Sequence, residues 1–196
     1  MSAPLDDPAL DALFRSARTR NSWQDKPLPQ GALQQIYDLA KWGPTAANST
    51  PARFVFCVSD AAKERLASAS SGNNQPKIKA APATVIIGYD LDFPEHLPRL
   101  FPHAPGMKNA FSDPQVTERT AMRNSSLQGA YLIVAARALG FDCGPMSGFD
   151  NAKVDELFFA GTQVKSNFIC SIGYGDEAGM FERLPRLDFD EACKII

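Results

Sequence analysis

The sequence predicts a single α+β domain built on one sheet, over residues 1–196. Helical and strand-like segments alternate along the chain, which is typical of helices packed on a central sheet. No internal repeat, low-complexity tract or polar linker divides the 196 residues into separate units. A chain of this length buries about 70% of its unfolded surface, which is enough for one sizeable core.

The N-terminal part is predicted to hold two helices and a strand. The first helix should begin at Asp6 or Asp7, because Asp caps a helix and the proline that follows suits its first turn. Its apolar stripe runs on for three turns, so we expect it to end near Arg20 and Asn21. After a loop with two prolines come a helix that ends at Trp42-Gly43-Pro44 and an aromatic, β-branched strand, Arg53–Ser59.

The middle of the chain is predicted to repeat this alternation. Asp60 should cap a helix over 61–70, and the Ser-Gly-Asn-Asn break at 71–74 precedes a short helical piece and a strand, Ala83–Asp90. Residues 91–114 carry five prolines among aromatic residues. Because this stretch is too apolar for a flexible linker, we expect an ordered excursion over the surface.

A long helix and the turn behind it organise the C-terminal half. The helix should begin at Ser112-Asp113-Pro114, and Gly140 should end it with a left-handed C-cap. The residues expected on its packed face are Leu127, Ala130, Tyr131, Val134, Ala135 and Ala138. A short strand and a turn over 144–148 should follow, and the small residues of this turn leave its backbone N–H groups open to a neighbour.

The last segments are a helix, a strand and a tail. Asp150 should cap a helix that ends at Leu157-Phe158-Phe159, and Ser166–Gly175 is predicted to be a strand. The tail over 183–196 is partly apolar, so we expect it to dock against a surface.

The composition excludes several kinds of partner. The net charge is −2 and 21% of the residues are charged, so no strong field attracts nucleic acid or an anionic membrane. No apolar run reaches transmembrane length, and the acidic N-terminus lacks the pattern of a signal peptide. We therefore expect a cytoplasmic protein without a nucleic-acid or membrane partner.

Few side chains are available for catalysis. His96 and His103 are the only histidines, and neither stands in a metal-binding or Ser-His-Asp pattern. Three of the four cysteines lie in strand-like runs, where we expect buried, inert thiols. No G-x-G-x-x-G sequence follows a strand. A bound cofactor other than a metal is therefore expected to supply the chemistry.

Two runs of sequence resemble a known family. ALGFDCGPMSGFD (138–150) is similar to the helix-to-strand turn of the FMN-dependent nitroreductase family, and RNSSLQGAYLIVAARALG (123–140) is similar to its long helix. Thr50-Pro51-Ala52 stands where most nitroreductases carry Gln-Pro-Trp, and Pro51-Ala52-Arg53 resembles the malonic semialdehyde reductase branch. The resemblance covers nearly the full length, including the proline-rich excursion.

The resemblance implies a set of cofactor-binding residues. Basic and hydroxyl residues near both ends of the chain would hold the flavin phosphate: Arg18, Thr19, Arg20, Arg183 and Arg186. The loop with Pro44, Thr45, Ala46 and Asn48, often donated by the other subunit, would lie at the pyrimidine side of the flavin. Asn74 and Lys77 would face the ring, and the turn with Pro145, Met146, Ser147 and Gly148 would present N–H groups to the flavin N5. Without the resemblance, these residues also have ordinary structural interpretations: the arginines as charges at a helix end, the two loops as turns, and Lys77 as a surface lysine.

The fold implied is a mostly antiparallel sheet flanked by helices, in an intertwined homodimer with FMN at the interface. NADH or NADPH would give hydride to the flavin N5, and a small-molecule acceptor would take it. No side chain would be catalytic in the strict sense, while Lys77 would give electrostatic support. The branch implies malonic semialdehyde as the acceptor, with Arg53 or Arg99 for its carboxylate. A broad nitro- or quinone-reductase and a flavin-binding carrier or sensor with little turnover are the alternatives.

Overall fold

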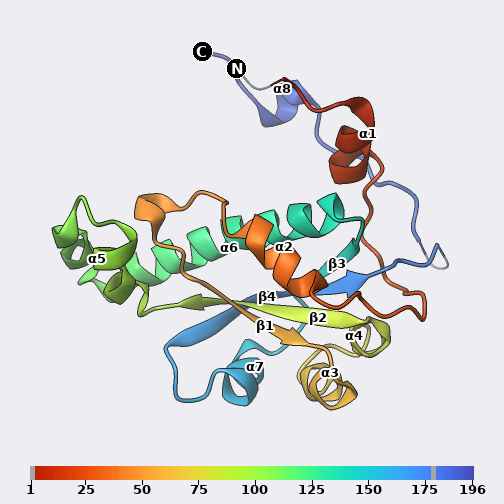
Figure 1. The fold of residues 1–196 in the computed structure, drawn as a ribbon, viewed down its shortest axis with the longest axis horizontal. Coiled ribbons are helices and arrows are strands. Elements are labelled where there is room, and N and C mark those ends of the chain that lie inside the picture. The colour runs from red at the N-terminus through yellow and green to blue at the C-terminus, as the bar shows by residue number, and fades with distance from the viewer. Residues whose placement is uncertain (1–2, 178–179) are drawn as a thin grey trace.

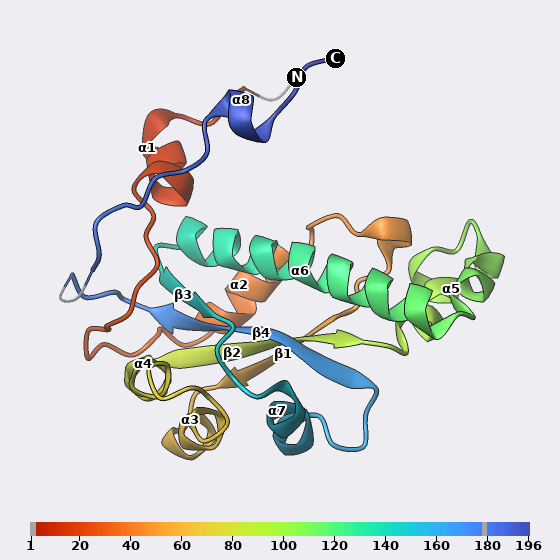
Figure 2. The same ribbon diagram turned by 180° about the vertical axis from the view of Figure 1, so that it is seen from behind.

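A computed structural model describes residues 3–177 and 180–196, and places a sheet between two layers of helices (Figures 1 and 2). α2 (Ala32–Ala40) and α6 (Pro114–Ala138) cover one face of the sheet. α3 (Asp60–Ala67) and α7 (Asn151–Phe158) cover the other face, and α4 (Gln75–Ala80) packs beside α3.

The sheet has four antiparallel strands in the order β1-β2-β4-β3. They are β1 (Ala52–Cys57), β2 (Ala83–Asp90), β3 (Asp142–Met146) and β4 (Val164–Gly173). Every residue of β2 is buried, because β2 is central and both its faces are covered, which explains the continuous apolar run in its sequence. The predicted α+β class and mostly antiparallel sheet are confirmed.

Local capping signals placed most helix ends correctly. Asp6, Asp113 and Asp150 each accept a hydrogen bond from a backbone N–H of the first turn that follows. Gly140 ends α6 with a φ of 81°, the left-handed conformation expected of a C-cap. α3 differs by one residue, because Ser59 is its cap and Asp60 is already helical.

The first helix ends earlier than its apolar stripe predicted. α1 (Asp7–Leu10) passes into one π-helical turn, Asp11–Arg15, and the chain then extends. The backbone N–H of Arg20 donates to the carbonyl of Cys143 at 3.0 Å, so this segment runs beside β3. A tertiary backbone bond therefore replaces the helical bonds expected near Arg20 and Asn21.

The buried face of α6 is only in part the one predicted. Its buried residues are mainly polar or small: Thr117, Ala121, Asn124, Ser125, Gln128, Gly129, Leu132, Ala135 and Ala136. Of the residues expected on the packed face, Ala135 is buried, but Leu127 and Tyr131 are 46% and 43% exposed, and Ala130 and Ala138 are exposed as well. Gly129 packs against the ring of Phe168 on the sheet and not against a second helix. α6 therefore has one face on the sheet and a second apolar face that is uncovered.

The proline-rich segment folds into short helical pieces around a small core of its own. These are Phe93–His96, α5 (Leu97–Leu100) and Pro105–Phe111. Phe93 and Leu97 pack with Tyr89 and Ala121, and an ion pair of Lys108 with Glu95 joins two of the pieces. The predicted ordered excursion is confirmed.

The C-terminal tail leaves the body of the molecule. It carries α8 (Phe189–Ala192) and lies with α1 in an arm above the helical layer in Figure 1. Phe181, Leu184 and Leu187 are each at least 70% exposed. The expected docking of the apolar tail is therefore not met within this chain.

Candidate functional site

Arginines from both ends of the chain and from α6 surround one cavity of about 590 Å³, called here the arginine cavity. Its basic lining residues are Arg18, Arg137, Arg183 and Arg186. Glu182 is the one acidic residue among the described residues that line it. An excess of guanidinium groups around one space favours an anion, and their forked donors suit a phosphate.

The arginines also tie the two chain ends together. Arg183 donates to the carbonyls of Arg15 at 2.6 Å and Ala17 at 3.1 Å, and Arg18 donates to the carbonyl of Phe181. Each guanidinium has five N–H donors, so these bonds leave others available. Of the residues predicted for the phosphate, Arg18, Thr19, Arg183 and Arg186 line the cavity together.

Arg20 lies outside this group. Its Nε is 3.2 Å from Asp142 Oδ1, and Asp142 in turn accepts the N–H of Gly175 at 2.9 Å. The Arg20 side chain crosses Gly175, where an added Cβ would lie 2.4 Å from it. The structure therefore places Arg20 in an ion pair at the end of β3, where it joins three segments of the chain.

The segment predicted as a turn over 144–148 is a strand end followed by a turn. Gly144, Pro145 and Met146 belong to β3 and pair with β4, and only Ser147 and Gly148 leave the sheet. Gly144 is required by the carbonyl of Arg20, which would lie 2.5 Å from an added Cβ. β3 is an edge strand, which explains how it accommodates a proline.

Asn74 fixes the turn that carries Ser147 and Gly148. Its Nδ2 donates to the carbonyl of Gly148 at 3.1 Å, and the N–H of Ser71 donates to the same carbonyl at 2.9 Å. Within residues 3–177 and 180–196, the N–H groups of Ser147 and Gly148 have no acceptor. Asn74 and the turn are thus brought together as predicted, and two N–H donors remain open.

Lys77 follows on the same short helix, α4. Its side chain is half-buried, and among the described residues its ammonium group has neither a hydrogen-bond acceptor nor an acidic partner. Lys79, two residues further on, pairs with Glu64 at 2.8 Å. Lys77 is therefore a cation available to a ligand beside the Gly148 turn.

The loop over 44–50 lies at the other end of α6. The N–H of Ala46 donates to Asn124 Oδ1 at 2.8 Å, and Asn48 Nδ2 donates to the carbonyl of Leu100 at 2.9 Å. Ala47, Asn48 and Thr50 have φ values of 51°, 47° and 37°, which are rare for side chains other than glycine. Such strain persists only where the surroundings impose it, and it is common at ligand sites.

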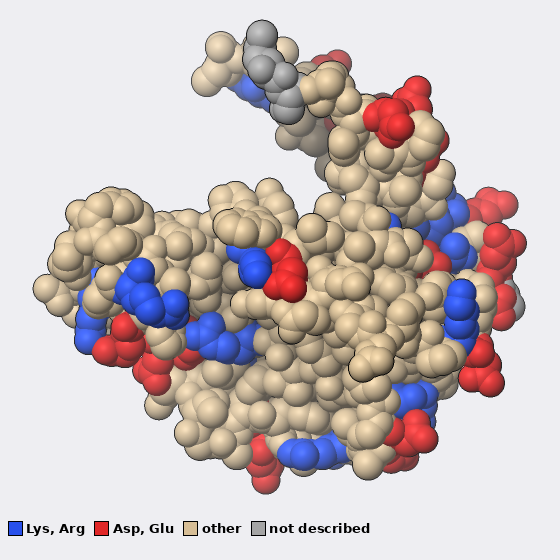
Figure 3. Space-filling view, in the orientation of Figure 1, with Lys and Arg blue, Asp and Glu red and all other residues tan. Residues whose placement is uncertain are grey.

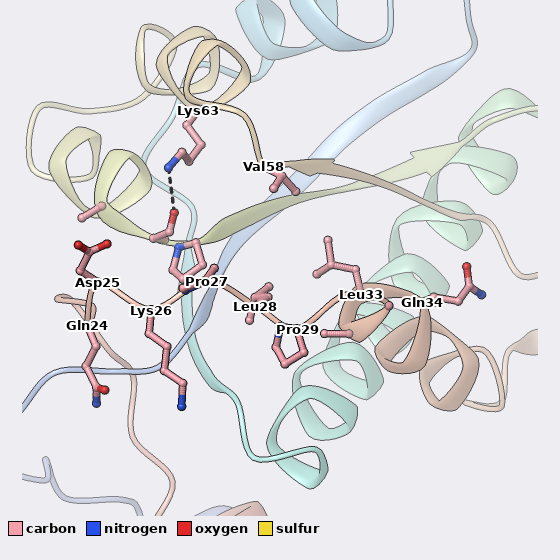
Figure 4. Close-up of a pocket in the computed structure, with 15 residues that line it drawn as sticks. Gln24, Asp25, Lys26, Pro27, Leu28, Pro29, Leu33, Gln34, Val58 and Lys63 are labelled. Atoms are coloured by element: carbon pink, nitrogen blue, oxygen red, sulfur yellow. Dashed lines mark hydrogen bonds between the residues drawn. The ribbon is translucent and has the colours of Figure 1, made fainter.

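Two further cavities lie at opposite ends of β1. One, of about 490 Å³, lies between the end of α2, the start of β1 and α5, and is called here the Arg99 pocket. The other, of about 450 Å³, is shown in Figure 4 and is walled by the loop over 24–29 and the start of α2. Lys63 points across its edge to the carbonyl of Ala81, and none of the predicted flavin residues lines it.

Three polar residues with structural importance were not predicted. Arg137 lines the arginine cavity, and its Nη1 donates to the carbonyl of Leu13 at 3.3 Å. Gln128 is buried in α6 and accepts the N–H of Ala52 at the start of β1, while Asn124 accepts the N–H of Ala46. Polar residues at helical spacing within an apolar helix were the signal that could have identified Asn124 and Gln128.

The cysteines are free, and Cys57, Cys143 and Cys170 are buried as expected. Burial raises the pKa of the Cys57 thiol to about 11. The pKa of Cys170 lies well above its usual range. The larger cause is a hydrogen bond between its thiol and that of Cys143, and the second cause is burial. Thiols in this state are poor nucleophiles.

Within the described residues there is no group of three or more potential metal ligands. No helix of the same residues has the length and apolar character needed to cross a membrane.

Comparisons with known proteins identify the fold and the family. Solved nitroreductase structures superpose over nearly the whole chain. One from Exiguobacterium sibiricum, described as a putative nitroreductase in complex with FMN, has a TM-score of 0.87 at 19% identity over 100% of both chains. A nitroreductase family protein from Streptococcus pneumoniae has a TM-score of 0.81 at 22% identity, over 94% of this chain and 98% of its own. The protein therefore has the nitroreductase fold.

Sequence comparison carries this further. The family model described as "Nitroreductase family" matches residues 15–175. A protein of Caulobacter sp. strain K31 named "Putative NADH dehydrogenase/NAD(P)H nitroreductase" is 66% identical over 99% of this chain and 100% of its own. A protein of the same name from Stenotrophomonas maltophilia strain R551-3 is 64% identical over 100% of both chains. The chain belongs to the nitroreductase family.

Proposed function

We propose that the protein is an FMN-dependent NAD(P)H oxidoreductase, a single domain over 1–196 that works as a homodimer. The observation that carries the proposal is the arginine cavity, joined through β3 to a turn with two open N–H groups and an unpaired lysine. The FMN complex from Exiguobacterium sibiricum and the names of the close relatives support the choice of cofactor and hydride donor.

The residues present fit an FMN molecule. Arg18, Arg183 and Arg186 would hold its phosphate, because several guanidinium groups face one cavity that holds a single acidic side chain among its described lining. Lys77 would stand near the part of the ring that gains negative charge on reduction, and a fixed ammonium there lowers the energy of the charged form. The N–H groups of Ser147 and Gly148 would donate to the ring edge.

When bound, FMN supplies the redox chemistry by taking hydride from NAD(P)H and giving it to an acceptor. The chain contributes position and charge: the arginines orient the phosphate, and the bond of Asn74 to Gly148 holds the turn. Arg20 supports the strand that leads to this turn through Asp142 and stays outside the proposed phosphate contacts.

The distance between the two halves of the site supports the proposed homodimer. The loop with Pro44, Thr45, Ala46 and Asn48 is anchored at Asn124, and the arginine cavity is lined by Arg137. Asn124 and Arg137 are 13 positions apart on α6, so they are separated by roughly 20 Å along the axis of this helix. A partner subunit related by a two-fold axis would bring its own loop to the arginine half of the site.

Uncovered apolar surface supports the same assembly. Leu127 and Tyr131 on α6 and Trp42 after α2 are exposed, and the tail exposes Phe181 and Leu184. In the view of Figure 3, uncharged residues make up most of the surface. Apolar surface that is contiguous and exposed marks association sites. We propose that the partner subunit covers this face and that the tail of each subunit docks on the other.

The acceptor proposed is malonic semialdehyde, reduced to 3-hydroxypropionate. NAD(P)H loses a hydride to become NAD(P)⁺, the aldehyde carbon gains it, and the aldehyde oxygen takes a proton from solvent. The sequence Pro51-Ala52-Arg53 supports this choice, because it leaves out the bulky aromatic residue that most of the family carries there. A cytoplasmic location is part of the proposal and agrees with four cysteines that are all free.

A broad nitro- or quinone-reductase is the second candidate, favoured by the names of the close relatives. One anaerobic experiment separates the possibilities. The visible spectrum of the purified protein is recorded, NADH or NADPH is added, and malonic semialdehyde or 1,4-benzoquinone follows. Rapid reoxidation by the aldehyde supports the first proposal, and reoxidation by the quinone alone supports the second. A bound flavin that neither nucleotide reduces would leave only a carrier or sensor, and failure to take up added FMN would overturn all three.

A further inference from the structure

The Arg99 pocket gathers three cationic side chains around an open space. Lys41, Arg53 and Arg99 line it together with His96, and none of the described lining residues is an Asp or Glu. Lys and Arg side chains, with Asp and Glu beside them, gather in the left half of Figure 3, where α5 lies and α2 ends. A cavity with this lining favours an anionic group over a neutral or cationic one.

Two of these cations are already neutralised. Lys41 pairs with Asp38 at 2.6 Å. Arg53 pairs with Asp90 and donates from Nη1 to the carbonyls of Thr50 at 3.1 Å and Ala52 at 2.9 Å. The charges of both residues are therefore already used in contacts within the chain, and Arg53 fixes the start of β1.

Arg99 is different. Among residues 3–177 and 180–196 its guanidinium has no hydrogen-bond or ion-pair partner, and the side chain of His96 has no hydrogen-bond or ion-pair partner there either. His96 and Arg99 lie three residues apart where the first helical piece of the excursion passes into α5. A planar fork of five donors, left unpaired at a cavity, suits a carboxylate.

One hydrogen bond connects Arg99 to the proposed flavin loop. Asn48 Nδ2 donates to the carbonyl of Leu100, the next residue, at 2.9 Å. This bond holds α5 against a loop whose backbone is strained at Ala47, Asn48 and Thr50. The buried hydroxyl of Ser49, in the same loop, has no partner among the described residues.

We propose that the Arg99 pocket binds the carboxylate of the acceptor, and that Arg99 selects small aldehyde or keto acids over neutral acceptors. The inference rests on the proposed function, since it takes the loop over 44–48 to lie against the flavin of the partner subunit. Arg99 would anchor the carboxylate while the carbonyl end reaches the ring. Arg53, which is bound to Asp90, positions the wall of the pocket.

The test compares Arg99→Ala and Arg99→Lys with Lys108→Ala. Lys108 belongs to the same excursion, pairs with Glu95 and does not line the pocket. For each protein, kcat/KM is measured for malonic semialdehyde and for propanal, and the affinity for malonate is measured by titration calorimetry. Circular dichroism of each variant checks that the fold is kept, as expected for the replacement of an exposed residue such as Arg99.

In Arg99→Ala we expect the preference for the semialdehyde over propanal to fall roughly 10- to 100-fold, and the Kd of malonate to rise by a similar factor. Arg99→Lys should recover part of this preference, because it keeps the charge without the fork. Lys108→Ala should match the wild type in both measurements.

Other outcomes would overturn the inference. An unchanged preference and an unchanged malonate affinity in Arg99→Ala would remove Arg99 from the acceptor site. A higher KM for NADPH but not for NADH, with acceptor preference unchanged, would assign the pocket to the coenzyme phosphate. If the wild type lacked reductase activity altogether, the proposed function would fail, while malonate binding would still decide whether Arg99 holds a carboxylate.

Discussion

The side-chain amide of Asn74 donates to the carbonyl of Gly148 at 3.1 Å, and this bond joins the cap of α4 to the turn that follows β3. The two residues are 74 positions apart in the sequence. Lys77 lies three residues after Asn74, on the short helix that this contact fixes against the turn. The contact thus joins the helix that carries Lys77 to the turn that carries the N–H groups proposed to face the flavin.

Gly148→Ala should weaken flavin binding while keeping the fold. An added Cβ would lie 2.8 Å from Asn74 Nδ2 and 3.0 Å from Ser71 Oγ, so the turn must shift. We expect the Kd of FMN, measured by fluorescence quenching, to rise roughly tenfold, and the stability to fall by about 1–3 kcal/mol. Gly72→Ala is the matched control, because nothing lies within 4 Å of its added Cβ. Equal FMN affinity in both variants would place the turn away from the flavin.

Lys77→Ala should slow reduction of the flavin. The unpaired ammonium would stabilise negative charge on the reduced ring, and removal of one such group reduces the rate by roughly 100- to 1,000-fold. Stopped-flow absorbance at the flavin band, with NADH in excess, measures this rate. Lys79→Ala changes the same helix but only breaks an exposed ion pair with Glu64, so its rate should equal that of the wild type. If both variants are reduced at the wild-type rate, Lys77 does not face the ring.

Arg186→Ala should weaken the affinity for FMN but not for riboflavin. The guanidinium lines the arginine cavity, and among residues 3–177 and 180–196 its donors reach the carbonyls of Leu184 and Pro185 alone. Loss of one charged hydrogen bond to phosphate corresponds to a Kd roughly 10- to 100-fold higher. Arg65→Ala, on the opposite side of the sheet, should leave both affinities unchanged. A loss of affinity equal for both flavins would mean that Arg186 acts through the fold and not through the phosphate.

Sequence alone predicted what is decided locally. Helix starts at Asp6, Asp113 and Asp150 and the stop at Gly140 depend on neighbours within one turn, so their residue types were sufficient. β2 was predicted with its exact bounds, because a central strand is apolar throughout. The grouping of Asn74 with Gly148, and of Arg18 with Arg183 and Arg186, came from the family resemblance and not from spacing.

Features that depend on distant residues were missed. Arg20 pairs with Asp142, and its backbone bonds to Cys143, which ended the first helix early. On α6 the apolar periodicity was real but belonged to two faces, and hydrophobicity does not distinguish a face covered by the sheet from one left for a partner. Buried polar residues such as Asn124 and Gln128 marked the inner face, because each satisfies a backbone N–H of the next layer.

Tyr89 should make the folded protein sensitive to alkaline pH. Burial, reinforced by its bond to Glu118, raises the pKa of Tyr89 to about 12 from an ordinary value of 10. The unfolded chain ionises first, so the contribution of this hydroxyl is complete below pH 10 and is lost as the pH rises towards 12. We expect the Tm to fall over this interval, and to fall less in Tyr89→Phe.

An absorbance titration of the four tyrosines checks the assignment. One tyrosine should ionise last in the wild type, and this late step should vanish in Tyr89→Phe but persist in Tyr37→Phe. If the late step vanished in Tyr37→Phe instead, the high pKa would belong to Tyr37, and the prediction for Tyr89 would be wrong.

Leu127→Glu should convert the proposed dimer to monomer and release the flavin. Leu127 is 46% exposed on the outer face of α6, so a carboxylate costs the monomer little but would be buried in a dimer. Without the partner, the loop anchored at Asn124 stays roughly 20 Å from the arginine cavity, and half of the site is missing. Light scattering after gel filtration, with the flavin absorbance of each peak, measures both effects.

Ala152→Glu makes the same kind of change on α7, on the opposite side of the sheet, and should remain dimeric with its flavin. A monomer of Leu127→Glu that keeps FMN at full affinity would show that one chain completes the site, and the partner loop would then have no place in it.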